Sequence, residues 1–111
     1  MRRRNSAAPQ SHASLFAALG DETRLTVLAK LCKGEPQSIS RLTEGSKLSR
    51  QAVTKHLRVL EDAGIVRCVR VGRESIFEFK PEPIDDARQF LNRVSAQWDE
   101  TLARLKSFVE E

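Results

Sequence analysis

The sequence predicts one mainly α-helical domain that carries a single β-hairpin. Apolar residues recur at helical spacing over residues 12–64 and again over residues 84–109. Between them, residues 65–79 alternate with period two around the pair Gly72-Arg73, a pattern typical of two strands joined by a tight turn. With 111 residues, the chain is long enough for one modest core and near the size at which a partner subunit helps.

The N-terminal residues 1–11, MRRRNSAAPQS, are polar and offer little to bury. We expect them to form a disordered basic tail, with residues 12–111 forming the domain. The run Arg2-Arg3-Arg4 can touch phosphate, although a solubilising extension is the simpler account. His12, next to this tail, is expected to be solvated.

Two helices should follow. The first begins at His12 and ends at Gly20, with an apolar stripe of Leu15, Phe16 and Leu19. Asp21 is a good N-cap for the second, residues 22–33, which Gly34 ends. The residues expected in the core from the second helix are Leu25, Leu28, Ala29 and Cys32.

Residues 38–65 predict two further helices joined by a turn at Gly45-Ser46-Lys47. Ser38 caps the first of them, which should bury Ile39 and Leu42. Ser49 caps the second, and Gly64 followed by Ile65 fits a Schellman stop. On a helical wheel this second helix is apolar on one side, at Val53, Leu57, Leu60 and Gly64. The opposite side carries Gln51, Thr54, Lys55 and Arg58.

The hairpin IVRCVRV-GR-ESIFEFK should bury Phe77 and Phe79 and leave Arg70 and Arg73 outside, so its tip is basic. Pro81-Glu82-Pro83 then ends the second strand. The remainder is a single helical pattern from about Ile84 to Val109, in which apolar residues recur from Ala87 onward with spacings of 4, 3, 4, 4, 3 and 4. A helix of that length spans roughly 40 Å, more than the diameter of so small a domain.

The apolar stripe of this last helix needs a cover from outside its own domain. We expect a homodimer through the terminal helices, the alternative being a monomer in which the helix folds back. The predicted interface residues are Leu15, Phe16, Leu19, Phe90, Leu91, Val94, Trp98, Leu102 and Leu105.

Charge is distributed unevenly around a net value of +4. Residues 38–58 hold five Lys or Arg and one acid, whereas residues 82–111 hold four and seven, so an anionic partner would meet the two-helix stretch. Five Phe, one Trp and no Tyr disfavour a stacking platform for single strands. Without an N-terminal apolar run, the chain is expected to be cytoplasmic, with no membrane partner.

No nucleophile with its base, phosphate-binding loop or pair of catalytic carboxylates is recognisable, which argues against an enzyme. Cys32 and Cys68 are too few for a disulfide framework and are expected to be small core residues. His56 falls at the edge of the apolar face, where it is expected to be structural, although it could reach a phosphate.

A helix-turn-helix followed by a basic two-stranded wing is a winged helix. The order of four helices, two strands and a long helix resembles the ArsR/SmtB family of bacterial dimeric transcriptional repressors over about residues 13–109. The motifs that carry this resemblance are FAALGDETRLTVLAKL, SRQAVTKHLRVLEDAGIV and GRESIFEF. It implies a homodimeric repressor that binds double-stranded DNA. A two-fold dimer would hold two such helices about one DNA turn apart, which predicts an inverted-repeat operator of about 12 to 20 base pairs.

The resemblance is to members without the cysteine metal box. Metal-sensing members carry a Cys-x-Cys pair before the recognition helix, and those positions here are Glu44 and Ser46. Another family site uses His and acidic ligands on the C-terminal helix, which here contains no histidine. We therefore expect no metal at those sites and no other cofactor, and the effector is unknown.

In this interpretation the recognition helix reads bases in the major groove. Gln51 suits adenine, Lys55 or Arg58 suits guanine, and Thr54 suits the thymine methyl or a base edge. The predicted phosphate contacts are Ser49, Arg50, Arg41 and Lys47, and the predicted minor-groove contacts are Arg73 with Arg70 behind it.

Three alternatives stay open. The first keeps DNA binding and adds a redox trigger at Cys32 or Cys68. The second is a protein-binding adaptor, in which the long helix recruits a partner and the basic surface only provides solvation. The third is constitutive DNA binding without an effector. The residues do not identify the operator or the regulated genes, and they do not distinguish a repressor from an activator.

Overall fold

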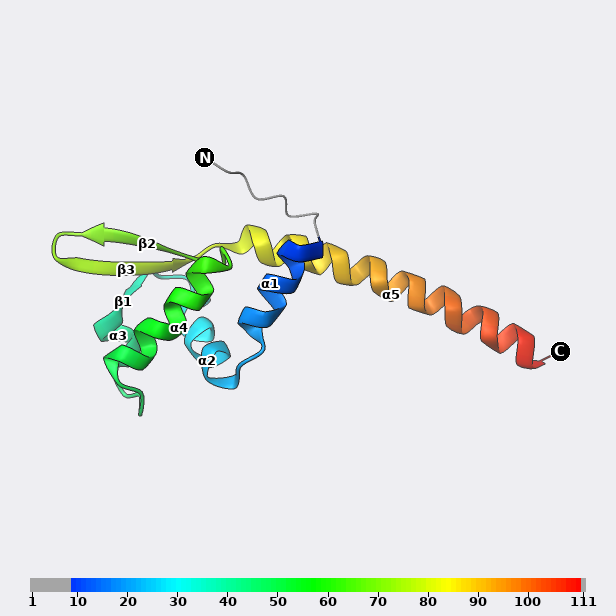
Figure 1. The fold of residues 1–111 in the computed structure, drawn as a ribbon, viewed down its shortest axis with the longest axis horizontal. Coiled ribbons are helices and arrows are strands. Elements are labelled where there is room, and N and C mark those ends of the chain that lie inside the picture. Colours follow the sequence, from blue (N-terminus) through cyan, green and yellow to red (C-terminus); the bar gives the residue numbers. More distant parts are fainter. Residues whose placement is uncertain (1–8, 111) are drawn as a thin grey trace.

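The computed structural model describes residues 9–110 (Figure 1). The order of elements is α1 (Pro9–Leu19), α2 (Glu22–Leu31), β1 (Gln37–Ser38), α3 (Ile39–Thr43), α4 (Arg50–Asp62), β2 (Val66–Val71), β3 (Glu74–Phe79) and α5 (Pro81–Glu110). This order confirms the prediction of a mainly α-helical winged helix-turn-helix with a hairpin. Residues 1–8 of the predicted tail lie outside the described residues, and Pro9–Ser11 belong to the first turn of α1.

The hairpin belongs to a three-stranded antiparallel sheet with the order β1-β3-β2. Strands β2 and β3 pair from Val66 with Phe79 to Val71 with Glu74, which leaves the two-residue loop that was predicted. Gly72, the first residue of the loop, has a φ of 63°, and Arg73, the second, does not have a positive φ. This combination is the one that a type II′ turn requires. Strand β1, which pairs with β3, was not predicted because two residues show no periodicity.

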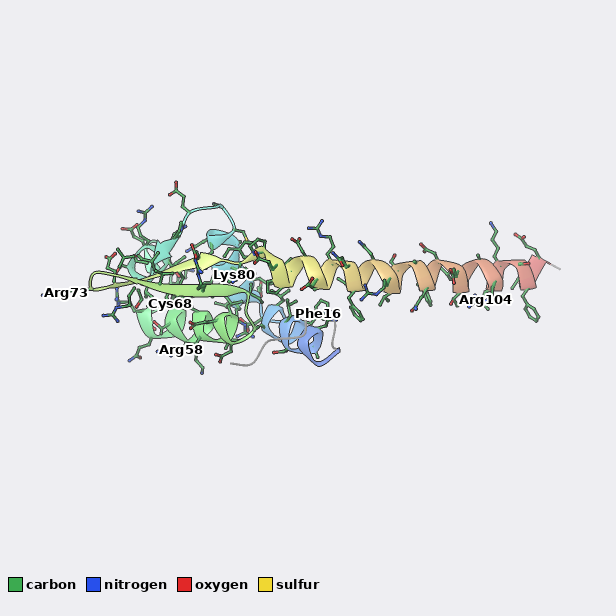
Figure 2. All side chains as sticks on the ribbon, turned by 90° about the horizontal axis from the view of Figure 1, so that it is seen from above. Phe16, Arg58, Cys68, Arg73, Lys80 and Arg104 are labelled. Atoms are coloured by element: carbon green, nitrogen blue, oxygen red, sulfur yellow. The ribbon has the colours of Figure 1, made fainter. Side chains whose placement is uncertain are left out.

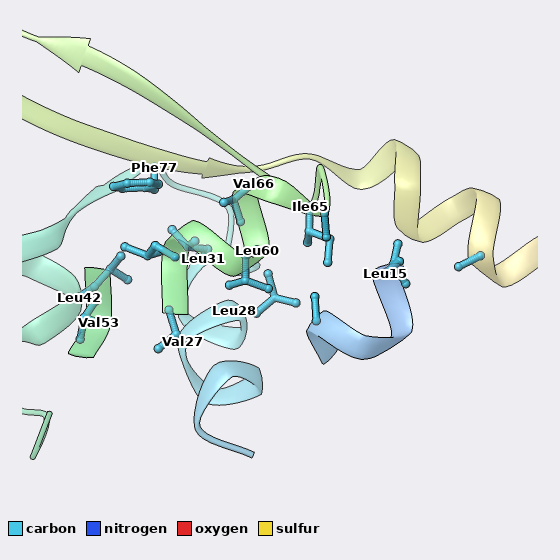
Figure 3. Close-up of a cluster of buried hydrophobic side chains, with 14 residues drawn as sticks. Leu15, Val27, Leu28, Leu31, Leu42, Val53, Leu60, Ile65, Val66 and Phe77 are labelled. Carbon is cyan, nitrogen blue, oxygen red and sulfur yellow. The ribbon is translucent and has the colours of Figure 1, made fainter. Parts of the chain in front are cut away.

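The core lies where α2, α3 and α4 meet the base of the hairpin (Figure 3). Val53, Leu57 and Leu60 of α4 are each 0% exposed, which confirms the predicted apolar face of that helix. Phe77 is buried and Phe79 is packed against the cluster from the same side of β3. One face of α4 is thus buried in the core, and its opposite face is exposed to solvent.

The predicted core face of α2 was only partly right. Leu28 is buried, but Leu25 is 46% exposed, and Ala29 and Cys32 are also exposed. Val27 and Leu31 take the core positions instead. The predicted stripe and the observed stripe are shifted by one residue along the sequence, which is about 100° around the helix. Both stripes contain apolar side chains, so periodicity alone could not choose between them. Cys32 is the C-cap of α2, which is why the expectation of a core cysteine there was wrong.

His12 was expected to be solvated but is only 5% exposed. Helix α1 begins at Pro9, three residues earlier than expected, so His12 lies within the helix and packs on α5. Its ring centroid is 4.7 Å from that of Phe90, and the ring of Phe16 lies 6.3 Å from the same phenylalanine. The start of α5 is therefore held against α1.

Helix α5 begins at Pro81 rather than Ile84, since proline suits the first position of a helix. Its 30 residues span about 45 Å, and most of the helix projects away from the rest of the chain (Figure 1). Ala87 is the one buried residue of the helix, and Phe90 is half-buried. None of the helices formed by residues 9–110 is long and apolar enough to cross a membrane.

Candidate nucleic-acid interface

Both ends of α4 are defined by local hydrogen bonds. The Ser49 hydroxyl accepts from the Ala52 amide over 3.1 Å at the N-terminal end. At the other end Gly64 has a φ of 81°, its amide donates to the Glu61 carbonyl, and the Ile65 amide donates to the Leu60 carbonyl, both over 2.9 Å. These bonds confirm the predicted N-cap and Schellman stop, and they determine where the exposed face of α4 begins and ends.

The exposed face of α4 carries a shallow concavity. The residues that line it are Arg50, Gln51, Thr54, Lys55 and Arg58. We call these five residues the reading face. It contains three cationic side chains and no carboxylate, and Figure 2 places Arg58 on the outer side of α4. The structure thus brings together all four side chains predicted to read bases.

Two residues of the reading face are already hydrogen-bonded to the protein. The Thr54 hydroxyl donates to the Arg50 carbonyl over 2.7 Å, so its proton is used inside the helix and the oxygen can act only as an acceptor. The Arg50 guanidinium donates to the Ser40 hydroxyl over 2.6 Å, which ties the start of α4 to α3. Gln51, Lys55 and Arg58 are exposed.

A smaller hollow lies between α3, the start of α4 and the hairpin. It is lined by Ser38, Ile39, Ser40, Arg50, Arg73, Glu74 and Ser75. We call it the wing hollow. It combines two guanidinium groups with the hydroxyls of Ser40 and Ser75, neither of which was predicted as a site residue. Their place depends on how the hairpin packs beside α3, for which the sequence contains no local signal.

The remaining predicted DNA contacts flank these two surfaces. Arg73 lies at the tip of the hairpin (Figure 2), and Arg70 is exposed on β2. Arg41 on α3 and Lys47 in the turn before α4 are also exposed. In contrast, Arg67 Nε donates to Glu78 Oε2 over 2.7 Å across the two strands, so its charge is paired within the hairpin.

The predicted dimer residues divide into three groups. Leu15 is 3% exposed in the core of its own chain, so its assignment to an interface between chains was wrong. Phe16, Leu19 and Phe90 are half-buried. The exposed members are Leu91 (49%), Val94 (44%), Trp98 (58%), Leu102 (44%) and Leu105 (53%). These five, which we call the α5 stripe, form an exposed apolar row along the projecting helix.

Cys32 and Cys68 differ in burial. Partial burial raises the pKa of the exposed Cys32 thiol, which lowers its thiolate fraction. Cys68 is half-buried on β2, opposite Phe77 in the strand register. Within residues 9–110 no group of three or more His, Cys, Asp or Glu is arranged to hold a metal ion.

The positions compared with the family's metal ligands have structural roles. Glu44 is the C-cap of α3, where its amide donates to the Ser40 carbonyl. The Ser46 hydroxyl accepts from the Leu48 amide over 3.0 Å in the turn that leads to α4. Neither side chain supplies a thiolate.

Known proteins resemble this chain in both sequence and structure. Residues 19–69 match the helix-turn-helix domain family. The HTH-type transcriptional regulator YuzN of Bacillus subtilis is 38% identical over 77 residues, which cover 64% of this chain and 84% of that protein. The arsenical resistance operon repressor of Bacillus subtilis is 27% identical over 70 residues, or 63% of this chain and 67% of that protein.

A solved structure, an ArsR-like transcriptional regulator from Rhodococcus sp. RHA1, is 39% identical and superposes with a TM-score of 0.81. The match covers 89% of this chain and 92% of that chain. These relatives are transcriptional regulators and not enzymes, and the likeness includes the helix that carries the reading face. The chain belongs to the ArsR-like family of winged helix-turn-helix transcriptional regulators, which bind DNA.

Proposed function

We propose that the protein is a homodimeric repressor that binds an inverted-repeat operator in double-stranded DNA without using the metal sites known in its family. The observation that carries this proposal is the reading face. Its cationic and amide side chains lie on the exposed side of a helix whose other side is fully buried. A single α-helix fits the major groove, where each base pair presents a distinct pattern of donors and acceptors.

Base reading is assigned to the exposed middle of the reading face. Gln51 can bond bidentately to adenine, and Lys55 or Arg58 can donate to guanine. Thr54 contributes its methyl group or an acceptor oxygen, since its hydroxyl proton is bonded to the Arg50 carbonyl. Ser49 can still donate its hydroxyl proton to a phosphate while its oxygen caps the helix.

Backbone contacts are assigned to the wing hollow and its surroundings. Arg50 and Arg73 line this hollow together with serine hydroxyls and one carboxylate, that of Glu74. The two guanidinium groups and the hydroxyls are the donors available to a phosphate oxygen. Arg41 and Lys47 extend the cationic surface along α3, and Arg70 extends it along the hairpin. Arg73 at the tip would flank or enter the neighbouring minor groove.

Dimerisation is assigned to the terminal helices. The α5 stripe is an apolar row that the chain does not cover, and Phe16, Leu19 and Phe90 continue it toward α1. A two-fold axis along this surface would place two recognition helices about one DNA turn apart, which suits an inverted repeat of about 12 to 20 base pairs.

Repression and metal independence rest on different observations. The resistance operon protein of Bacillus subtilis is named a repressor, and we extend that role to this chain. Glu44 and Ser46 occupy the positions where metal-sensing relatives carry thiolates, and both take part in turn and cap bonds. The raised pKa of Cys32 disfavours the alternative of a thiol trigger at that residue.

Selection of bound fragments from the source genome tests this function. We expect an enriched inverted repeat and a slope of log affinity against log salt of about −5 to −7, if six to eight phosphates are neutralised. Gln51→Ala should blur one base position in each half-site at a cost of about 1 to 3 kcal/mol, whereas Arg73→Ala should weaken all sequences nearly alike.

Arg104→Gln serves as the control, because Arg104 is exposed near the far end of α5 (Figure 2). A pool without any enriched site would contradict the proposal and favour the adaptor alternative. An unchanged motif after Gln51→Ala would show that the reading face is assigned to the wrong residues.

A further inference from the structure

We propose that Arg24 is a positioning residue for DNA binding, which joins the C-terminal end of α1 to the recognition helix α4 through a neutral His56. This inference rests on the proposed function. Arg24 is the third residue of α2 and lies on the same helical stripe as Val27, Leu28 and Leu31, half-buried among apolar core positions. A guanidinium in such a place is retained only with several hydrogen-bond partners.

Two of these partners belong to α1. Arg24 Nε donates to the Ala18 carbonyl over 2.6 Å, and Nη2 donates to the Ala17 carbonyl over 3.5 Å. Both carbonyls lie in the last turn of α1, which contains no basic residue of its own in that turn. Arg24 therefore caps α1 from outside, with its positive charge at the negative end of the helix.

The third partner belongs to α4. Arg24 Nη1 lies 3.4 Å from His56 Nδ1. Because a guanidinium has only donors, His56 Nδ1 must accept with its lone pair. The imidazole in this arrangement is neutral and carries its proton on Nε2. At 3.4 Å the bond is long, so its own energy is small.

Asp21 completes the cluster. Its Oδ2 accepts from the Arg24 amide over 2.8 Å, which caps α2, and lies 4.0 Å from His56 Nδ1. In the competing arrangement, a protonated His56 would donate to Asp21 and repel Arg24. The two arrangements differ in the proton on His56 Nδ1, and this difference can be measured.

The cluster of Asp21, Arg24 and His56 lies between the recognition helix and α1, so it can position one relative to the other. His56 follows Lys55 of the reading face directly in sequence, and its side chain is 20% exposed. Helix α1 is in turn held against α5 through Phe16 and Phe90. One guanidinium thus connects the recognition helix to the terminal helices, and in a dimer this connection sets the angle and spacing of the two recognition helices.

Nitrogen NMR of the free wild-type protein near neutral pH tests the hydrogen bond itself. We expect His56 Nδ1 to be unprotonated and Nε2 to carry the proton. Arg24→Gln should change the His56 Nδ1 shift, whereas Arg88→Gln, a change at an exposed arginine on α5, should not. A proton on Nδ1 in the wild type would overturn the proposal whether or not the protein binds DNA.

A double-mutant cycle on the selected duplex tests the positioning role. His56→Phe keeps an aromatic ring and removes the acceptor, whereas His56→Asn keeps an acceptor oxygen near the Nδ1 position. We expect Arg24→Gln and His56→Phe each to weaken binding by about three- to tenfold, with the double variant no weaker than the more severe single variant. His56→Asn should stay within about twofold of the wild type.

Several results of this cycle would overturn the proposal. Additive losses would mean that His56 contacts DNA independently of Arg24, and full affinity in His56→Phe would mean that the bond has no positioning role. If Arg24→Gln does not fold, Arg24→Lys replaces it, since an ammonium keeps the charge but cannot reach both carbonyls and the imidazole. If the wild type enriches no duplex, the proposed function fails, and the NMR measurement still decides whether the bond exists.

Discussion

The Arg50 guanidinium donates to the Ser40 hydroxyl over 2.6 Å, so a residue at the start of the recognition helix is held by the preceding helix α3. Both residues also line the wing hollow, together with Arg73. The bond holds a flexible cationic side chain toward the place assigned to a phosphate, which reduces the side-chain entropy that binding would otherwise cost.

Ser40→Ala removes this restraint and leaves the guanidinium itself in place. We expect DNA affinity to fall by about two- to fivefold on specific and random duplexes alike, because phosphate contacts carry no base information. The free energy of unfolding should change by less than about 0.5 kcal/mol, since both side chains are exposed. Fluorescence anisotropy with the two duplexes measures the effect, and Ser95→Ala on α5 is the control. A loss confined to the specific duplex would contradict a phosphate role.

Gly64→Ala tests the stop of the recognition helix. Its φ of 81° is strained for any residue with a Cβ, so we expect a loss of about 1 kcal/mol in the free energy of unfolding. Gly20→Ala is the matched control, because Gly20 also follows a helix and has an ordinary φ. A Cβ added there would lie 3.4 Å from the Phe16 carbonyl oxygen, an ordinary van der Waals contact. Urea denaturation compares the two variants. Equal stability of both would mean that the Schellman geometry contributes nothing.

Signals close together in sequence predicted the recognition helix and the hairpin well. Ser49 and Gly64 mark their ends of α4 through bonds to residues three to five positions away, and Gly72 begins the predicted turn. Features that depend on packing between distant segments were missed. Strand β1 exists only because Gln37 and Ser38 pair with β3.

The same limit applies to the site. Helical periodicity placed four residues on one exposed side of α4, where the structure also has them, because they lie on a single helix: Gln51, Thr54, Lys55 and Arg58. Ser40 and Ser75 come from different elements, and no periodicity connects them. The face of α2 was misassigned because both possible stripes contain apolar residues. Arg24 lies beside the core positions because it bonds to α1 and α4, and these contacts between distant segments leave no local signal.

Trp98→Glu tests the α5 stripe. Trp98 is 58% exposed in the single chain, so a carboxylate there should leave the fold of the protomer intact. In a dimer, two such carboxylates would face an apolar interface at a cost of several kcal/mol. We expect a shift from dimer to monomer in analytical ultracentrifugation. Operator binding should also weaken, because a monomer bound at one half-site no longer raises the effective concentration of a second subunit at the other. Gln97→Glu is the control on the neighbouring residue, and a Trp98→Glu protein that remains dimeric would place the interface elsewhere.

His12→Phe tests the contact between α1 and α5. The imidazole is buried beside Phe90, and neither of its nitrogens has a hydrogen-bond partner among the described residues. Burying such a group costs free energy that a phenyl ring of similar shape avoids. We expect His12→Phe to raise the free energy of unfolding by about 1 kcal/mol, measured by urea denaturation at a fixed protein concentration. His12→Ala should instead lower it, because the stacked ring is lost. A destabilised His12→Phe protein would mean that the imidazole has a partner in the assembled molecule, and the terminal helices of a second copy would be the first place to search for it.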